Sequence, residues 1–310
     1  MSPARAAGGE RAAGASPAPA PSSADSPRPL SDEELAAFRA DVRAQGEELY
    51  RDLPWRNTRD PYAVWISEAM LQQTQVVRVL SRWERFLGRF PTLDALAAAS
   101  TADVVAEWQG LGYNRRAIAL KRAADICAAQ HGGRLPEGVD ALRALPGIGE
   151  ATAAGITAFS RDVPCIYIET NVRAVFIDRF FPHAEKVSDA QLRPLVSQAC
   201  PPTGVRSWYY ALLDLGAYLK KTQVNPTRRA ASYTRQSAFA GSRRQKRAWL
   251  VREVMAAPGL SGEALRERLS VAEAAAGRER VDAATFESIM ADLAREGFFR
   301  QDEAGAWFSA

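Results

Sequence analysis

Leu145-Pro146-Gly147-Ile148-Gly149 is the stretch that decides the predicted fold. Ala141-Leu142-Arg143-Ala144 before it is typical of the end of one helix, and a second helix is expected from Glu150 to Phe159. The two glycines permit positive φ and leave backbone N–H groups free at the start of the second helix, where a phosphate can approach them. An ordinary corner between helices would use glycine in the same way. The residues on either side decide between these two interpretations.

Two glutamates flank this stretch in patterns that favour a functional site. Glu169 follows Gly149 by twenty positions and stands just ahead of another apolar helical run. Glu68 lies within a segment whose apolar residues recur at helical spacing. Taken alone, Glu68 could be a first-turn residue that the helix dipole favours. The sequence around it points elsewhere.

Several motifs in one order carry a resemblance to a known family. The run Pro61-Tyr62-Ala63-Val64-Trp65-Ile66-Ser67-Glu68-Ala69-Met70-Leu71-Gln72-Gln73-Thr74-Gln75-Val76 is the longest of them. The others are Pro54-Trp55-Arg56, Phe90-Pro91-Thr92, Trp108-Gln109-Gly110-Leu111-Gly112-Tyr113 and the glycine stretch with Ile168-Glu169-Thr170-Asn171-Val172. Together they resemble the MutY-type adenine DNA glycosylases of the helix-hairpin-helix, endonuclease III-like superfamily. The resemblance covers about Leu53 to Lys221. It implies a mainly α-helical, two-lobed fold.

The resemblance also assigns roles to residues of this chain. Glu68 matches the general acid that protonates the adenine leaving group, and Asn171 matches a residue that hydrogen-bonds within the site. Glu169 stands where the carboxylate that supports the sugar is found. Gln73 matches the residue that wedges into the base stack; without the resemblance, it and its neighbour would be solvated amides. The expected DNA-contacting residues of this part of the chain are Gln72, Gln73, Tyr113, Gly147 and Gly149.

The chemistry of base release explains why two carboxyl groups are needed. Cleavage of an N-glycosidic bond requires a proton for the departing base and negative charge beneath an oxocarbenium-like sugar. Glu68 would be the acid, with its pKa raised in an apolar cleft that a flipped base closes to water. Glu169 would stay ionised and stabilise the sugar cation or activate water.

Two residues depart from the family pattern. The family normally has Asp where this chain has Glu169, and a displacement of about 1 Å can cost about 10²-fold in rate. The chain therefore needs a compensating backbone shift or has a different substrate. Ala151 stands where bifunctional relatives carry a lysine that forms a Schiff base. Alanine is no nucleophile, so the resemblance predicts a monofunctional glycosylase without lyase activity.

Cysteine usage predicts that no iron–sulfur cluster is bound. Relatives usually hold a cluster through four cysteines that follow the helix expected at Trp208–Leu219. Residues 220–241 contain no cysteine, and the chain's three cysteines are isolated: Cys127, Cys165 and Cys200. A cluster requires closely spaced thiolates, and the two separated histidines make a zinc site unlikely to form. No metal or cofactor is therefore expected, and isolated thiols suit a reducing cytoplasm.

A basic run follows the region that resembles the family. Residues 215–252 contain ten Lys or Arg residues and no Asp or Glu, in a chain of net charge +4. This concentration favours a surface that faces phosphates, although a solvated face or a flexible tail remains the alternative. The residues expected at DNA are Arg228, Arg229, Arg243 and Arg244.

Four segments are predicted in the 310 residues. Residues 1–29, rich in Ala, Pro and Ser, should be disordered and are not a secretory signal. Residues 30–221 form the glycosylase domain, which begins with Ser31 as a helix cap. Residues 222–242 replace the cluster loop, and residues 243–310 form three helices and a β-hairpin that resemble a winged helix. That domain would be either a DNA-binding module or a packing module. No transmembrane segment is expected.

The leading function is a monofunctional base-excision-repair glycosylase that removes adenine opposite guanine or 8-oxoguanine. Its partner would be duplex DNA with a mismatch or lesion, bound by a cytoplasmic, nucleoid-associated monomer. Nothing in the chain resembles the Nudix-like domain with which MutY-type enzymes recognise 8-oxoguanine. Two alternatives stay open. One is removal of another base, such as thymine or uracil opposite guanine or a damaged base, and the other is a catalytically weak lesion-binding protein.

Overall fold

The N-terminal helix begins at the predicted cap. The structure, a computed structural model, describes residues 28–236 and 238–310. The Ser31 hydroxyl accepts a hydrogen bond from the Glu34 N–H, and the Glu34 side chain accepts one from the Ser31 N–H. This reciprocal pair satisfies two N–H groups that a helix start would otherwise leave without partners. It opens α1 (Asp32–Glu48). The predicted disordered tail, residues 1–29, lies almost entirely outside the described residues.

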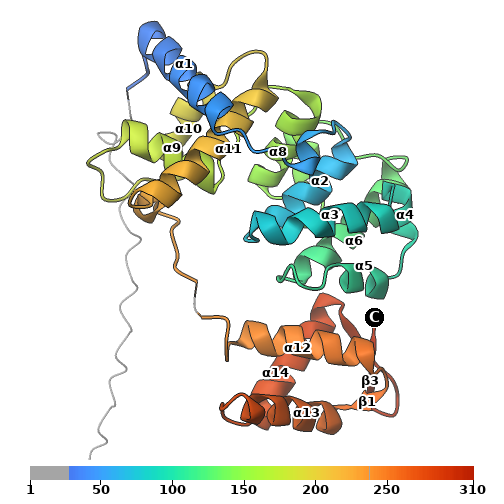
Figure 1. Ribbon diagram of the computed structural model, residues 1–310. Helices are drawn as coiled ribbons and strands as arrows, with labels where there is room; N and C mark the ends of the chain where they lie inside the picture. Colours follow the sequence, from blue (N-terminus) through green and yellow to red (C-terminus); the bar gives the residue numbers. More distant parts are fainter. Residues whose placement is uncertain (1–27, 237) are drawn as a thin grey trace, which may run out of the picture.

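Two helical lobes make up the body of the protein (Figure 1). The first lobe, at the upper left of Figure 1, contains α1, α9 (Thr170–Phe180), α10 (Asp189–Ala199), α11 (Val205–Thr222) and the 3₁₀ helix η3 (Pro226–Arg229). The second contains η2 (Pro54–Arg56), α2 (Pro61–Leu71), α3 (Val76–Arg89), α4 (Leu93–Ala98), α5 (Thr101–Glu107), α6 (Arg115–Gln130), α7 (Val139–Arg143) and α8 (Glu150–Arg161). The predicted mainly helical, two-lobed architecture is confirmed.

The lobes meet along α2 and α8, which contribute to both hydrophobic cores. Trp65 and Ile156 belong to the core of the second lobe, whereas Val64 and Phe159 belong to that of the first. Both helices are apolar around most of their circumference, as expected for helices covered on two sides. Side chains on these helices therefore lie near the boundary of both lobes.

A buried ion pair also joins the lobes. Arg56 of η2 donates two hydrogen bonds to Asp214 of α11, at 2.6 and 2.9 Å. Arg206, about two turns before Asp214 on α11, donates to the carbonyl oxygens of Arg56 and Thr58 at 2.8 and 2.7 Å. Both members of the Arg56–Asp214 pair are almost fully buried. The bidentate geometry compensates the cost of removing two charges from water.

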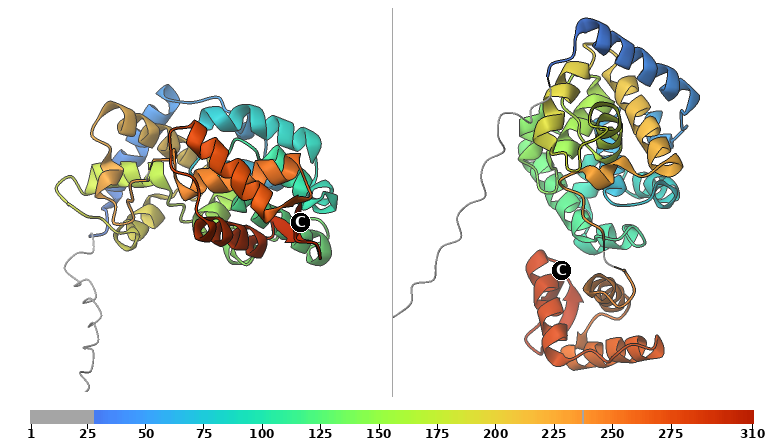
Figure 2. Two further views of the ribbon diagram at one scale, coloured as in Figure 1. Left: turned by 90° about the horizontal axis from the view of Figure 1, so that it is seen from below. Right: turned by 90° about the vertical axis from the view of Figure 1, so that its left-hand side faces the viewer.

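Residues 243–310 form a separate C-terminal domain below the second lobe (Figures 1 and 2). It consists of α12 (Arg243–Ala256), β1 (Leu260–Ser261), α13 (Gly262–Ala275), α14 (Ala283–Glu296), β2 (Phe299–Gln301) and β3 (Ala306–Ser309). The antiparallel sheet has the order β1-β3-β2, with Leu260 opposite Trp307 and Arg300 opposite Phe308. The three predicted helices and the terminal hairpin are confirmed, and Asp282 caps α14.

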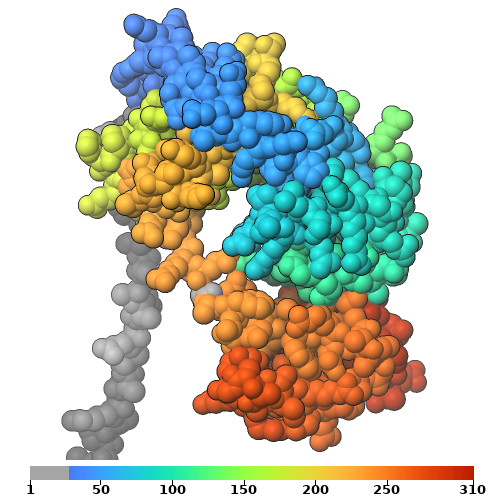
Figure 3. Space-filling model, in the orientation of Figure 1, coloured from blue at the N-terminus to red at the C-terminus, as the bar shows by residue number. Residues whose placement is uncertain are grey.

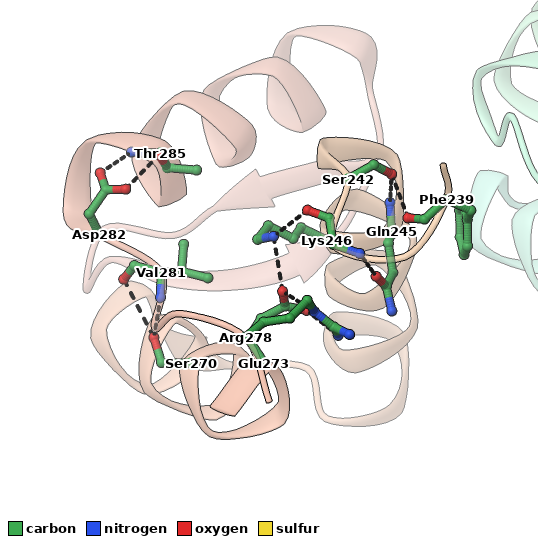
Figure 4. A network of polar contacts seen from close by, with 11 residues as sticks. Phe239, Ser242, Gln245, Lys246, Ser270, Glu273, Arg278, Val281, Asp282 and Thr285 are labelled. Carbon is green, nitrogen blue, oxygen red and sulfur yellow. Dashed lines mark hydrogen bonds and ion pairs between the residues drawn. The ribbon is translucent and has the colours of Figure 1, made fainter. Parts of the chain in front are cut away.

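The linker, residues 230–242, joins η3 to α12. Polar contacts hold the C-terminal domain to the end of this linker (Figure 4). The buried carboxylate of Glu273 lies between Lys246, at 3.0 Å, and Arg278, at 2.8 Å. Lys246 also donates to the Gly241 carbonyl oxygen at 2.8 Å. Lys246 thus connects the end of the linker, at Gly241, to Glu273 of α13.

The domain packs against the second lobe rather than standing free. Buried Trp108 and Leu250 belong to one hydrophobic cluster that spans both parts. Arg122 of α6 donates to the carbonyl oxygen of Glu296 at 3.1 Å. The linker, orange in Figure 3, crosses from the first lobe to this domain, and a hollow lies between it and the second lobe. Among the described residues, no helix combines the length and apolar character needed to cross a membrane.

Candidate active site between the two lobes

A cavity of about 890 Å³ lies at the boundary of the lobes. That volume lies within the range usual for small-molecule sites. Its walls come from η2, α2, α8, the start of α9 and one face of α11. The predicted site residues that line it are Glu68, Gln72, Gln73, Gly147, Gly149, Glu169 and Asn171. Residues that are far apart in the sequence therefore meet at one cavity, as the family resemblance implied.

Glu68 lies in the second half of α2, not in its first turn. The cap of this helix is Asp60, which accepts hydrogen bonds from the N–H groups of Tyr62 and Ala63. The interpretation of Glu68 as a dipole-favoured first-turn residue is thus wrong, because the C-terminal half of a helix disfavours an anion. Burial and the neighbouring charge of Glu169 raise the pKa of Glu68 to about 8. The group is therefore mainly protonated at neutral pH.

Glu169 forms the cap of α9. One carboxylate oxygen accepts hydrogen bonds from the N–H groups of Asn171, at 2.5 Å, and Val172, at 2.9 Å. Capping is usually performed by shorter side chains, so the longer Glu169 folds back onto its own helix. Burial raises the pKa of Glu169, and the two N–H groups together with Lys220 and Arg173 act in the opposite direction. Donors and cations thus favour its ionised form.

Asn171 supports this carboxylate and leaves one atom free for a ligand. Its side-chain amide donates to the second oxygen of Glu169 at 3.2 Å. The amide oxygen Oδ1 is buried and has no hydrogen-bond partner within the described chain. A buried acceptor without a partner is costly unless a water or substrate donor completes it.

The turn after α2 places the two predicted glutamines differently. Gln72 donates to the Thr152 hydroxyl of α8 at 2.8 Å, so it faces the cavity. Gln73 is exposed and has a φ of 54°, which is uncommon for a residue with a side chain. Arg116 holds the turn, because its guanidinium donates to the carbonyl oxygens of Met70, at 2.9 Å, and Gln72, at 2.7 Å.

Tyr113 lies outside the cavity but close to Gln73. The side-chain amide of Gln236, in the linker, donates to Gln73 Oε1 at 2.9 Å and to the Tyr113 hydroxyl at 2.5 Å. Arg244 donates to the same hydroxyl at 2.9 Å. Tyr113 also has a positive φ, of 47°. The structure therefore brings Gln73, Tyr113 and Arg244 together at one edge of the cavity mouth.

The glycine hairpin connects α7 to α8 as predicted, and its two glycines differ. Gly147 has a φ of 76°, and a Cβ there would lie 2.7 Å from the Ala119 side chain. Gly149 has a φ of −81° and caps α8 in an extended conformation, so the expectation of positive φ is wrong for this residue. No side chain caps α8, which leaves its first N–H groups for a ligand.

The predicted basic contacts do not gather at one surface. Arg229 donates to carbonyl oxygens of the first lobe, including that of Ala184 at 3.4 Å. Arg243 forms an ion pair with Asp292 of α14 at 2.6 Å. Arg228 is exposed, with no ion-pair partner among the described residues. The structure thus uses Arg229 and Arg243 within the protein and leaves Arg228 facing solvent.

Several residues that line the cavity were not predicted from the sequence, among them Tyr167, Arg173, Tyr210 and Lys220. Tyr210 and Lys220 lie on α11 and share a face with Leu213 and Ala217, at helical spacing. That spacing is visible in the sequence and could have revealed them. Tyr167 and Arg173 flank Glu169, and only proximity to the motif could have indicated them.

The residues present do not fit an iron–sulfur cluster. The three cysteines are free thiols, and Cys127 is buried in the core of the second lobe. Within residues 28–236 and 238–310, no three His, Cys, Asp or Glu side chains gather as metal ligands would. A cluster requires four thiolates at one place. The absence of a cluster stays a prediction.

Comparison with known proteins agrees with this geometry. The family model described as HhH-GPD superfamily base excision DNA repair protein matches residues 66–202. An adenine DNA glycosylase from Mycobacterium tuberculosis is 40% identical over 150 residues, which cover 48% of this chain and 47% of the relative. The human adenine DNA glycosylase is 34% identical over 200 residues, covering 59% of this chain and 36% of the relative. The chain thus matches about half or less of these relatives' length.

Solved structures share the fold at lower sequence identity. A thermostable thymine-DNA glycosylase matches with a TM-score of 0.54 and 23% identity over 60% of this chain and 87% of its own. A trapped endonuclease III–DNA covalent intermediate matches with a TM-score of 0.53 and 18% identity over 61% and 87%. Residues 66–202, which carry Glu68, Glu169 and the glycine hairpin, match the HhH-GPD superfamily of base excision DNA repair proteins, and this region of the chain belongs to it.

Proposed function

We propose that this protein is a monofunctional DNA glycosylase that hydrolyses the N-glycosidic bond of adenine opposite guanine or 8-oxoguanine. One observation carries the proposal: two carboxyl groups face one cavity and burial raises the pKa of both, but only at Glu169 do backbone N–H donors and cations oppose that rise. Glu68 has a pKa of about 8, while N–H donors and cations surround Glu169. Such a separation of two carboxyl groups assigns one as acid and the other as anion.

The reaction uses these groups in sequence. Glu68 gives its proton to a ring nitrogen of the flipped base as the C1′–N bond breaks, and the bonding electrons leave with the base. The ionised Glu169 stabilises the positive charge that develops on the sugar. Water then adds to C1′ and passes a proton to a carboxylate. The products are the free base and an abasic site in an intact strand.

A lyase step is not part of the proposal. Ala151 follows Glu150 in the first turn of α8 and lines the cavity, but it carries no amine that could form an imine with the sugar. Strand breaks should therefore appear only after alkali treatment, and borohydride should trap no covalent adduct.

The substrate base is inferred from the named relatives. The curated relatives from Mycobacterium tuberculosis and human are adenine DNA glycosylases, which supports adenine over thymine. The test is a panel of duplexes incubated with the full-length protein and then treated with alkali. We expect cleavage of adenine opposite guanine or 8-oxoguanine. Cleavage of thymine or uracil opposite guanine instead would replace the substrate, and binding without any cleavage would favour a lesion-binding protein.

We also infer that the protein acts on duplex DNA as a monomer in the cytoplasm, a reducing compartment that suits its three free thiols. The C-terminal domain resembles a winged helix in its order of elements. Its helix α14 is covered by α12, through Arg243 with Asp292 and Arg247 with Glu296. This coverage supports a packing role for that face of α14 over direct readout of bases.

A further inference from the structure

Glu68 lies against two residues at the cavity wall: Gly155 of α8, and Tyr167 in the segment before α9. Gly155 of α8 has no side chain, and a Cβ there would lie 2.3 Å from Glu68 Oε2. The same Cβ would lie 3.2 Å from ring carbon Cε2 of Tyr167. Real Cβ atoms do not approach other atoms as closely as 2.3 Å, and a distance of 3.2 Å is a tight contact. The missing side chain of Gly155 therefore creates the space in which Glu68 and Tyr167 meet.

Tyr167 makes the hydrogen bond that this space permits. Its hydroxyl lies 3.2 Å from Glu68 Oε2. This is the carboxyl group's one hydrogen bond within the described part of the chain. An ionised carboxylate can only accept, so the phenol is the donor in that state. Burial and the two nearby glutamates hold the pKa of Tyr167 far above its usual range, which keeps the donor proton in place.

The Tyr167 side chain is itself fixed in position. Its ring packs edge-on against Phe159 and Tyr209, with centroids 5.3 and 5.2 Å apart. Its backbone N–H donates to the Tyr209 hydroxyl at 3.2 Å. Only 4% of the residue is exposed. A donor held this way can orient the carboxyl group that it contacts, as the third group of a catalytic triad orients the base.

We propose that Tyr167 is a positioning residue that holds Oε2 of Glu68 and directs the acidic proton to Oε1, the oxygen that accepts no hydrogen bond within the described residues. Gly155 is the second part of this arrangement, because any larger residue would displace the carboxyl group from the phenol. The proposal rests on the proposed glycosylase function for its kinetic consequence, but the orientation itself is a property of the protein without DNA.

The kinetic test compares Tyr167→Phe with wild type in single-turnover base release between pH 5 and pH 10. The rate below pH 7 should fall about tenfold, as expected for the loss of one hydrogen bond. The fall in rate at alkaline pH should move to higher pH, because the phenol's hydrogen bond lowers the pKa of Glu68 and its loss leaves burial unopposed. A purely structural role would lower the rate without moving the profile.

Tyr62→Phe is the matched control. Tyr62 is also buried and donates a phenol hydrogen bond, to the Phe90 carbonyl oxygen at 2.8 Å, but neither residue lines the cavity. Its removal should cost comparable thermal stability and leave the pH profile in place. Gly155→Ala should lower the rate about 10²-fold through displacement of the acid. In that background, Tyr167→Phe should have no further effect on the profile.

A measurement without DNA separates this proposal from the glycosylase function. Infrared or carbon-13 NMR titration, with Glu68→Gln as the reference that identifies the signal, gives the pKa of Glu68 directly. We expect about 8 in wild type and a higher value in Tyr167→Phe. An unchanged pKa in that variant would overturn the proposal even if the enzyme is active. A raised pKa would uphold it even if no tested duplex is cleaved.

Discussion

Glu68 and Glu169 share one cavity, and the difference in their surroundings determines how activity should depend on pH. As the proposed acid, Glu68 has to be protonated to act, and burial beside Glu169 raises its pKa to about 8. Single-turnover base release should therefore be constant near pH 6 to 7 and fall as the pH rises through about 8. Rates measured across this range with one duplex test the assignment. A rate that rises through pH 8 would identify Glu68 as a base instead.

The variant Glu68→Gln should retain DNA affinity and lose base release by at least about 10²-fold, because the amide keeps the shape and lacks the acidic proton.

The same variant tests the raised pKa of Glu68 through the thermal stability of the protein. A carboxyl group whose pKa is raised on folding favours the folded state only while protonated, so wild type loses stability as the pH rises from about 4.5 towards 8. The melting temperature of Glu68→Gln relative to wild type should increase over that range. A constant difference would contradict the raised pKa.

Substitution of Glu169 separates the charge from the length of the side chain. Asp60 caps α2 with hydrogen bonds from Tyr62 and Ala63, the same pattern that Glu169 forms on α9. Glu169→Asp should therefore keep the cap and the charge and retain base release within about tenfold of wild type. Glu169→Gln keeps the length, removes the charge and should lose at least about 10²-fold. Equal losses in both variants would show that reach, rather than charge, limits the reaction.

At the scale of elements, Arg116 joins the end of α2 to the loop before α6. Its guanidinium donates to the carbonyl oxygen of Ala69 at 2.7 Å and to that of Gly112 at 3.0 Å, besides Met70 and Gln72. Burial lowers its pKa to about 10, so it stays charged in this position at neutral pH. Arg116→Met should lower the free energy of unfolding by about 3 kcal/mol, because several carbonyl groups lose their donor. Urea denaturation measures this loss.

The neighbouring Arg115 provides the control for that variant. Its side chain is 75% exposed and 3.8 Å from Glu296. Arg115→Met should change the free energy of unfolding by no more than about 0.5 kcal/mol. Hydrogen exchange at residues 72–74 and 111–113 should accelerate in Arg116→Met alone. Equal effects of the two variants would mean that Arg116 does not hold these turns.

Elements with a strong local signal could be predicted from the sequence. The Ser31 capping box, the hairpin at Gly147 and the helix after Asp282 follow from side chains next to each other in the chain. Elements that depend on distant partners could not. The two-residue strand β1 exists because β3, some 45 residues later, lies beside it. Strand pairing is a tertiary property that propensity does not encode.

The candidate site divides in the same way. Glu68, Glu169 and Asn171 were found because the motifs around them are long. Tyr167 was missed because its proposed role depends on the space that Gly155 leaves on α8. A contact between two segments that are distant in the sequence produces no periodic pattern in it. The sequence shows that residues 215–252 are basic, but it does not show which of these side chains form ion pairs within the protein. Arg243 lies opposite Asp292 only after α12 and α14 pack.

At the scale of the whole molecule, ion pairs neutralise part of the basic run and leave another part free. Lys246 pairs with Glu273, and Arg247 with Glu296. Lys221, Arg228 and Arg235 are exposed and have no ion-pair partner in the described ranges. They lie at the end of α11, in η3 and in the linker, and the linker borders the hollow beside the second lobe (Figure 3). These three residues are the better candidates for phosphate contacts.

Replacement of all three residues by Gln should weaken duplex binding and flatten its dependence on salt. Each phosphate contact contributes a slope of about −0.9 to the logarithm of the binding constant against the logarithm of salt concentration. The triple variant should therefore lose up to about 2.7 from that slope, equally for matched and mismatched duplexes, since phosphate contacts carry no sequence information. Arg243→Gln, in the same run but paired with Asp292, is the matched control and should leave the slope unchanged. Fluorescence anisotropy between 50 and 200 mM salt, about the range over which phosphate contacts dominate, measures both. If Arg243→Gln flattened the slope as much as the triple variant, DNA would have to break the ion pair with Asp292, and the basic run would act as one surface after all.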